Sequence, residues 1–485
     1  VTKRYRRGSI DFHRRSEEIR MTQNSHARSL LAIFLLAFFL RGAVLFLDTR
    51  CFDRDPEHYR QMARSLRAEG SLLLGKAPTA IISPLYPAML AAVSYCSRPL
   101  TPERAGQSTP QMWAHHLMLS PNASVALLHW ILGVATVILV FQTALELRLP
   151  EWIAFVCALL TAADPILLYR SRLVLPDTAI AFFTSAVIFT LLWAQHRTGP
   201  GQWVLLFSAG LCCGLGALLH WFFLPFTALI ALVLLILPWL RSGERRLPHA
   251  AAFVFLAAAA IVLFPWGARN YRQFGRPLLM TSRVGESLYL GNNPSYYDTY
   301  KLLILFDEEA FGRQWEERLQ SEYDKLGIAA DTPNAEVVRN TLAARLAQET
   351  IRLRPYDFLW AAGSRMASLW RLTPQRIEQL PPESTDQIRT GIRLFYGVEF
   401  LLAALGLLKL LLKLCAGRPC PAGWLWPLAA VAALVAIHLV FPAEIFDRGA
   451  IQPAIALIAG VFLVRERAPS SKEESAPNVL SDAKQ

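Results

Sequence analysis

Long uninterrupted apolar runs dominate this chain and predict a bundle of membrane-spanning helices. An apolar run of about 20 residues crosses a hydrocarbon layer of about 30 Å as an α-helix. Ten segments meet that description: 29–47, 123–145, 151–169, 176–194, 203–219, 222–240, 249–266, 395–415, 423–441 and 447–464. An eleventh run, 84–97, is short and flanked by proline, so we expect it to lie at the membrane interface. The predicted fold class is an all-α polytopic membrane protein with about 10–12 transmembrane helices.

Basic residues mark the span ends that face the cytoplasm. Short loops rich in Lys and Arg stay on that side of the cytoplasmic (inner) membrane, and here they cluster before the first span and after every second span. The chain then divides into a cytoplasmic basic tail (1–28), a transmembrane core (29–266) with its first outer loop (48–122), a second outer-face loop (267–394), C-terminal spans (395–464) and a disordered cytoplasmic tail (465–485). Both termini are predicted to be cytoplasmic, and a site in the long loops faces outside.

Two further segments have a specific interpretation. Residues 1–20 are interpreted as an upstream extension, because Met21 lies just ahead of the first span. A signal peptide is not expected, since no small-residue cleavage site follows the first apolar run. In the second outer loop, 336–353 and 354–372 have helical periodicity. Trp360 and Arg365 in the latter segment predict an amphipathic helix on the membrane surface.

Composition and charge agree with a membrane protein. Of 485 residues, 54% are hydrophobic and 18% are charged, and the mean hydropathy is +0.32. The net charge of +12 and the pI near 9.5 could indicate nucleic-acid binding. Most of that charge lies at the cytoplasmic span ends, however, as the positive-inside rule requires, so nucleic acid is not an expected partner. The seven cysteines lack metal-ligand spacing, and we assign no residue as a metal ligand.

Two acidic residues at the outer face are the candidate catalytic groups. Asp55 follows the first span, where Pro56 can open a helix that continues through Tyr59, and Asp177 begins a later span. Each could simply cap its helix, a role worth about 1 kcal/mol. Because both are predicted at one membrane face, they also suit a general base and a second carboxylate that orients a hydroxyl or a metal. Asp53 and Asp55 form a DxD pair, but the nucleotide sugars that such pairs bind with a metal are cytoplasmic.

Polar residues near the other outer span ends are candidate binding groups. An arginine just beyond a span, such as Arg269, can hold a phosphate bidentately, or its side chain can simply reach the lipid head groups. The GNNP turn (291–294) offers amides that suit sugar hydroxyls or an ordinary turn. His220 at the end of another span is either a packing residue or a ligand contact. The candidate substrate-binding residues are Asp53, Tyr59, His220, Arg269, Asn270, Arg272, Asn292 and Asn293.

Several blocks follow one another in an order that is typical of one family. They are Arg41; Asp55, Tyr59 and Ala63; PLYP (84–87); LPDTAIAFF (175–183); PWGARNYRQFGRP (265–277) before GNNP; and RPYDFLWAAGSRMASLW (354–370). In this order they resemble the GT-C class of integral-membrane glycosyltransferases, which includes the protein mannosyltransferases and the aminoarabinose transferase of lipid A. The chain departs from its relatives at His220, where many carry an arginine, and in EIFDRGAIQP (444–453), which lacks an aromatic residue found there in the family.

The resemblance implies a reaction and a set of partners. A sugar would pass, with inversion, from a polyprenyl-phosphate carrier to an acceptor hydroxyl at the outer face of the membrane. Asp55 would be the general base, Asp177 a second acidic residue, and Arg269 with Arg272 would hold the carrier phosphate. The acceptor would be an envelope lipid, glycan or protein. No cofactor follows from the resemblance, and a divalent metal stays open.

Two other functions compete with this hypothesis. A transporter or flippase of a lipid-linked envelope intermediate would need charges in the middle of the membrane, and Arg41, Asp164 and Glu399 are the few candidates. A non-catalytic scaffold predicts that replacing Asp55, Asp177 and Arg269 changes stability only.

Overall fold

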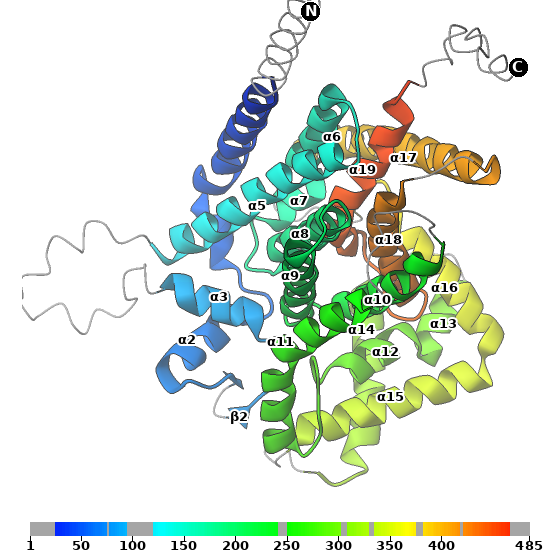
Figure 1. The fold of residues 1–485 in the computed structure, drawn as a ribbon. Coiled ribbons are helices and arrows are strands. Elements are labelled where there is room, and N and C mark those ends of the chain that lie inside the picture. Colours follow the sequence, from blue (N-terminus) through cyan, green and yellow to red (C-terminus); the bar gives the residue numbers. More distant parts are fainter. Residues whose placement is uncertain are drawn as a thin grey trace, which may run out of the picture.

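Helices make up nearly all of the described chain (Figure 1). The computed structural model describes residues 25–74, 77–94, 120–240, 250–301, 308–328, 334–374, 382–417 and 421–465. The predicted tails therefore lie largely outside the described residues. The elements up to α11 are the first helix (Ser25–Phe46), η1 (Thr49–Asp53), α2 (Tyr59–Glu69), β1 (Leu73–Leu74), β2 (Ala77–Pro78), α3 (Leu85–Ser94), α5 (Pro121–Glu146), α6 (Glu151–Ala163), α7 (Pro165–Arg170), α8 (Asp177–Gln195), α9 (Pro200–Ala217), α10 (Phe223–Leu240) and α11 (Ala251–Phe274). The later elements are α12 (Val284–Gly291), α13 (Pro294–Lys301), α14 (Glu308–Asp324), α15 (Ala335–Leu353), α16 (Pro355–Leu369), α17 (Pro382–Cys415), η3 (Ala422–Trp424), α18 (Leu425–His438), η4 (Ile445–Ala450) and α19 (Gln452–Leu463).

The predicted spans correspond to helices of the structure. Within the described residues, five helices are long and apolar enough to cross a membrane: the first helix, α5, α8, α9 and α11. Shorter apolar helices include α6, α18 and α19. The interfacial segment predicted at 84–97 is α3, a helix of 10 residues. The prediction of an all-α, multi-pass membrane protein is confirmed.

Three predicted spans differ in detail. The span predicted at 151–169 is two helices, because Pro165 has no N–H to continue α6. Asp164 then caps α7 by accepting a hydrogen bond from the Leu167 N–H at 2.7 Å. The span predicted at 249–266 continues as α11 to Phe274 and ends at Gly275, whose positive φ of 68° suits a helix terminus. The last predicted span, 447–464, contains the end of η4 before α19 begins.

Small residues let the apolar helices approach one another closely. A Cβ atom added to Gly210 of α9 would overlap the carbonyl oxygen of Phe255 in α11. A Cβ atom on Gly406 of α17 would likewise overlap the carbonyl oxygen of Ile458 in α19. Since these oxygens belong to helix backbone, a larger side chain would push each helix pair apart. The α17–α19 pair also packs on α6 through α19, which brings the C-terminal helices against the N-terminal half.

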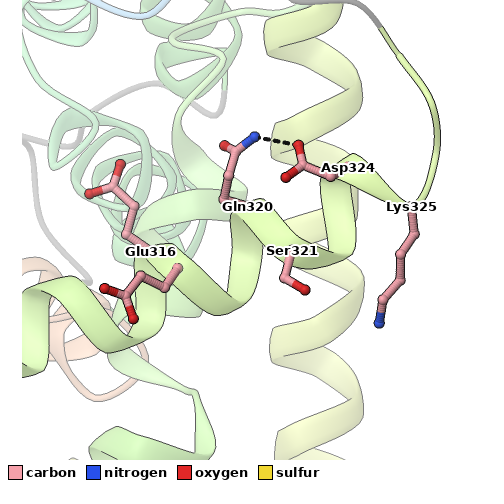
Figure 2. Close-up of a pocket in the computed structure, with 6 residues that line it drawn as sticks. Glu316, Gln320, Ser321, Asp324 and Lys325 are labelled. Atoms are coloured by element: carbon pink, nitrogen blue, oxygen red, sulfur yellow. Dashed lines mark hydrogen bonds between the residues drawn. The ribbon is translucent and has the colours of Figure 1, made fainter.

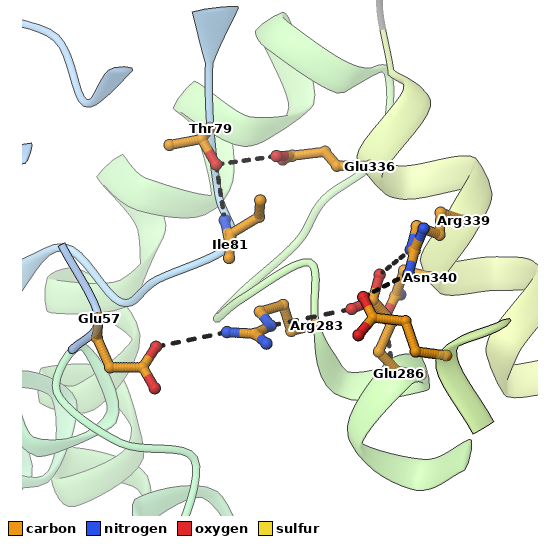
Figure 3. Close-up of polar contacts among 10 residues, drawn as sticks. Glu57, Thr79, Ile81, Arg283, Glu286, Glu336, Arg339 and Asn340 are labelled. Carbon is orange, nitrogen blue, oxygen red and sulfur yellow. Dashed lines mark hydrogen bonds and ion pairs between the residues drawn. The ribbon is translucent and has the colours of Figure 1, made fainter. Parts of the chain in front are cut away.

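The two long segments that were predicted to face outside lie at the same end of the bundle and contact each other. In Figure 1, α2 and β2 lie on one side of that end and α12 to α15 on the other. Figure 3 shows Glu57, which precedes α2, within 3.5 Å of the Arg283 guanidinium beside α12. Thr79 Oγ1 donates a hydrogen bond to Glu336 of α15 at 2.9 Å, and the Ala80 N–H donates to the other oxygen of that carboxylate at 2.9 Å. The helices of these two segments are therefore connected to each other through residues 79 and 80.

The two helices predicted from periodicity in the second outer loop are present as α15 and α16. One face of α16 exposes apolar side chains, with Leu359 66% and Trp360 56% exposed. The expectation that Arg365 lies on the membrane surface is wrong. Its side chain is fully buried and donates to the carbonyl oxygens of Gly291 at 2.8 Å and Leu439 at 2.6 Å, because two carbonyls at helix ends lack other donors.

Candidate active site

The first candidate, Asp55, lies at the N-terminus of α2. Its carboxylate accepts hydrogen bonds from the Tyr59 N–H at 2.9 Å and the Arg60 N–H at 2.7 Å. The helix was expected to open at Pro56, but it begins at Tyr59, after His58 with a positive φ of 58°. Asp55 therefore does cap the helix. Each carboxylate oxygen still has a second lone pair, so capping leaves room for a proton-accepting role.

Asp53 belongs to a short polar chain that joins the first loop to α5. Its carboxylate accepts a hydrogen bond from Asn122 Nδ2 at 2.7 Å, and Asn122 Oδ1 accepts one from Arg60 at 2.7 Å. Burial lowers the pKa of the Arg60 guanidinium, while Asp55 and Asp53 oppose that effect. The charges of Asp53 and Asp55 thus both act on one cation, Arg60.

Two tyrosines connect the first loop to the helix bundle. The Tyr59 ring packs edge-on against Tyr86 of α3, with 4.9 Å between ring centroids. The Tyr86 hydroxyl lies 2.9 Å from Nε2 of His129 in α5, whose Nδ1 lies 2.7 Å from the Ser171 carbonyl oxygen. Because a carbonyl can only accept, Nδ1 carries the proton and the tyrosine hydroxyl donates to Nε2. Tyr86 lies within the PLYP block, but nothing in the sequence pattern pointed to His129.

The second candidate, Asp177, is the first residue of α8. Its Oδ1 accepts a hydrogen bond from Arg170 Nε at 2.8 Å, and both side chains are mostly buried. Arg170 ends α7, and its guanidinium also lies over the Phe446 ring, 5.2 Å from the ring centroid. The partner of Asp177 is thus a side chain from another helix. A partly buried ion pair of this kind is stronger than an exposed one.

The charges of both candidate carboxylates act on Tyr59. Burial raises the pKa of Tyr59, and the negative charges of Glu57, Asp177 and Asp55 raise it further. The starts of α2 and α8, which lie more than 100 residues apart in the chain, thus carry two carboxylates whose charges both act on Tyr59.

The C-terminal half adds charged residues that the sequence analysis did not select. Burial lowers the pKa of His220 to about 4, and the negative charges of Asp447 and Asp177 partly offset this. Asp447 in η4 also acts on Arg170, and its Oδ2 lies 3.7 Å from Nε2 of His438. The sequence analysis named the segment that contains Asp447, EIFDRGAIQP (444–453), only because it departs from the family pattern. His220 thus shares its surroundings with Asp177.

The predicted phosphate ligand Arg269 already has protein partners. Its guanidinium donates to the Thr79 carbonyl oxygen at 3.0 Å and to Asn270 Oδ1 at 2.8 Å, and it lies 5.0 Å from the centre of the Trp266 ring. Asn270 is fully buried. Arg272, one turn further along α11, is exposed. Of the two arginines, Arg272 is thus the one whose guanidinium faces outward.

The GNNP amides lie inside the protein. Asn292 Nδ2 donates to the Leu288 carbonyl oxygen at 2.8 Å and the Val440 carbonyl oxygen at 2.7 Å, and its Oδ1 accepts from the Tyr297 hydroxyl at 3.0 Å. Asn293, also buried, accepts a hydrogen bond from the Tyr296 N–H at 2.9 Å. These amides connect α12, α13 and the segment after α18, so in this conformation neither presents its polar atoms to a sugar.

A surface pocket of about 690 Å³ lies elsewhere, on α14. Figure 2 shows that its side chains project from this one helix and its end, and Gln320 donates to Asp324 at 2.7 Å. No predicted site residue lines this pocket. Among the described residues, no group of three or more His, Cys, Asp or Glu side chains has the arrangement of a metal site. The carboxylates around Tyr59 therefore remain the candidate active site.

Comparisons with known proteins identify the fold. The family model described as dolichyl-phosphate-mannose-protein mannosyltransferase matches residues 99–273, a little over a third of the chain. The crystal structure of the Archaeoglobus fulgidus oligosaccharyltransferase in the apo form is similar, with a TM-score of 0.50 and 14% identity over 89% of this chain and 50% of that one. The chain has a GT-C glycosyltransferase fold. The resemblance predicted from the sequence is thereby confirmed.

A further solved structure is more distant. ArnT from Cupriavidus metallidurans bound to undecaprenyl phosphate has a TM-score of 0.37 and 14% identity over 90% of this chain and 77% of that one. No curated protein sequence matches this chain significantly. The chain spans about half the length of the archaeal oligosaccharyltransferase. At 14% identity, the similarity to these solved structures is a similarity of fold.

Proposed function

We propose that this GT-C chain transfers a sugar from a polyprenyl-phosphate carrier to an acceptor hydroxyl at the outer face of the cytoplasmic membrane, with inversion. The observation that carries the proposal is a run of contacts between the two candidate carboxylates. It leads from Asp55 through Tyr59, Tyr86 and His129 to Ser171, the neighbour of the Arg170 that bonds Asp177. The family match and the fold support a glycosyltransferase. The acceptor is an envelope lipid, glycan or protein.

The chemistry needs a proton acceptor and a leaving group. The acceptor O–H gives its proton to an Asp55 carboxylate oxygen while its oxygen attacks the anomeric carbon of the sugar. The bond between that carbon and the carrier phosphate breaks, and polyprenyl phosphate leaves with the electron pair. Asp177, held by Arg170, orients the acceptor hydroxyl. This division of roles matches a common pattern in which two carboxylates in different surroundings do different work.

Carrier binding is assigned to the end of α11. Arg272 is exposed there, while Arg269 holds the backbone of the neighbouring hairpin. A guanidinium at the membrane surface suits a lipid phosphate because its forked donors match the phosphate oxygens. Arg269 then acts by fixing the end of α11 and Arg272 by contact with the phosphate.

The test is a transfer assay in proteoliposomes. The purified chain is reconstituted with polyprenyl phosphate carrying a radiolabelled hexose or pentose, and an envelope extract supplies acceptors. We expect label to leave the carrier fraction with the wild-type chain and to stay there with Asp55→Asn and Asp177→Asn. Undiminished transfer by both variants would overturn the assigned roles.

The same vesicles test transport. A flippase moves the labelled carrier across the bilayer without moving label off the carrier, so the two functions give different products. A transporter would need charged groups in the middle of the membrane to interact with its substrate. Asp164 and Glu399 both accept hydrogen bonds from Gln452 instead, and this favours the transferase.

A further inference from the structure

A polar cluster lies inside the helix bundle, apart from the residues around Tyr59. Its members are 0–1% exposed and come from the α6–α7 junction, α17, η4 and α19: Asp164, Tyr396, Glu399, Arg448 and Gln452. Gln452 Nε2 donates to Asp164 and also to Glu399 at 3.3 Å. The proposed reaction uses none of these groups, although burying them in an apolar bundle is costly.

One arm of the cluster fixes the start of α7. The Tyr396 hydroxyl accepts a hydrogen bond from the Ile166 N–H at 3.0 Å and donates to Asp164, lying 3.1 Å from each carboxylate oxygen. Asp164 Oδ1 accepts from the Leu167 N–H at 2.7 Å. Because Pro165 has no N–H, these are the first two donors of α7, and both are held by the cluster. A helix of 6 residues is too short to be stable by itself, so its position depends on such bonds.

The other arm fixes η4. The Arg448 guanidinium lies over the Tyr396 ring, 4.3 Å from its centroid, and donates to the carbonyl oxygens of Leu369 at 3.0 Å and Arg371 at 2.7 Å. The residue before it is Asp447, whose charge acts on both His220 and Arg170. The ring of Tyr396 therefore holds η4 while its hydroxyl holds α7.

We propose that Tyr396 is a positioning residue for the candidate active site. It sets α7, which ends in the Arg170 that pairs with Asp177, and η4, which carries Asp447, in a fixed relation to each other. The expected effect of Tyr396 on sugar transfer rests on the proposed function. Its expected effect on the position of α7 rests on the hydrogen bonds alone. In Figure 1, α19 lies beside α6 and α17 beside α19. Tyr396 joins α17 to α7, so the C-terminal helices act on the site through this contact.

The decisive variant is Tyr396→Phe, which removes the hydroxyl and keeps the ring under Arg448. The matched control is Glu399→Gln, one turn further along α17, which keeps the volume and the hydrogen bond to Gln452. Each full-length variant is reconstituted and examined in three ways: amide hydrogen exchange of the 164–180 segment, binding of undecaprenyl phosphate, and sugar transfer in the proteoliposome assay.

We expect Tyr396→Phe to raise the exchange rate of the α7 amides about tenfold, as loss of a buried hydrogen bond to a charged group would. Transfer falls about tenfold in kcat, while the dissociation constant of undecaprenyl phosphate and the KM for the carrier stay unchanged. Glu399→Gln behaves as the wild type in all three measurements. A second variant, Asp164→Ala, should produce the same exchange pattern, because it removes the cap of Leu167.

Other outcomes overturn the inference. Wild-type exchange and transfer in Tyr396→Phe would show that its hydroxyl positions nothing, and equal losses in Glu399→Gln would show a general packing effect. If Tyr396→Phe does not fold, Asp164→Ala takes its place in the test. An exchange rate of the α7 amides equal to that of the wild type in Asp164→Ala would then overturn the inference. A failure of the proposed function is distinguishable, because then the wild type transfers no label while Tyr396→Phe still accelerates exchange in α7.

Discussion

Arg170 Nε donates a hydrogen bond to Asp177 Oδ1 at 2.8 Å, so the last residue of α7 is bonded to the first residue of α8. The segment between them makes the turn that separates these helices. Asp447 and Glu444 of the C-terminal half also act on the Arg170 guanidinium. The charges of three carboxylates thus act on one cation, and Asp177 is the one that accepts its hydrogen bond.

Replacing Asp177 by Asn should abolish transfer without unfolding the protein. The amide keeps the volume and can still accept from Arg170, but the negative charge near Tyr59 is lost. We expect kcat to fall by about 100-fold, the loss that a misplaced reactant can cause, because Asp177 orients the acceptor hydroxyl. The measurement is label transfer in proteoliposomes. Asp298→Asn, on an exposed pair with Arg354, is the control and should keep full activity.

Asp55 offers a way to separate capping from catalysis. Asp55→Asn keeps one oxygen that can accept from a backbone N–H of α2, whereas Asp55→Ala removes both acceptors. If Asp55 is the base, both variants lose transfer, and only the Ala variant loses a further amount of stability of about 1 kcal/mol. Melting temperature and transfer are measured on the same samples. Near-normal transfer by Asp55→Asn would assign the residue to capping alone.

The two arginines at the end of α11 should respond differently. Arg272→Gln is expected to weaken undecaprenyl phosphate binding about tenfold and to reduce its salt dependence, with no change in melting temperature. Arg269→Gln should lower the melting temperature, because it leaves the Thr79 carbonyl and Asn270 without their donor. Weaker undecaprenyl phosphate binding in Arg269→Gln, together with unchanged binding in Arg272→Gln, would instead assign the phosphate contact to Arg269.

His220 should make stability fall at mildly acidic pH. Its folded pKa of about 4 lies below the ordinary value of 6.5, so between these pH values the unfolded chain binds a proton that the folded chain does not. Stability is therefore complete above about pH 6.5 and is lost as the pH falls toward 4, by up to about 3 kcal/mol. Melting temperature against pH measures this. His220→Gln should flatten the curve.

Asn292 should matter for stability through the connection between α12 and the segment after α18. Asn292→Leu removes donors to Leu288 and Val440 and leaves the Tyr297 hydroxyl without its acceptor. We expect a loss of about 2–3 kcal/mol, seen as a lower melting temperature in detergent. Asn340→Ala, which removes one bond to the Gly285 N–H, should cost less. A stable Asn292→Leu chain that loses only transfer would instead support the sugar-contact hypothesis.

Much of the fold follows from the lengths of apolar runs. In a membrane each backbone N–H must be satisfied within its own helix, so a run of sufficient length predicts a helix whatever its neighbours are. The predicted span at 123–145 is α5, Pro121–Glu146, for this reason. Breaks were harder to predict. The span at 151–169 ends at Asp164 because Pro165 follows, and a proline inside α11, Pro265, leaves that helix unbroken.

The sequence alone also predicts that Asp55 and Asp177 lie at one membrane face, because alternating spans determine the side on which each residue lies. Side-chain partners were decided only by the tertiary structure. Asp164 bonds to Tyr396 across 232 positions, and Arg365 bonds to Gly291 across 74. Nothing in local spacing specifies such pairs, because hydrogen bonds depend on which helix faces pack together. The physical reason is that hydropathy is a property of each segment, whereas an active site is a property of the contacts among segments.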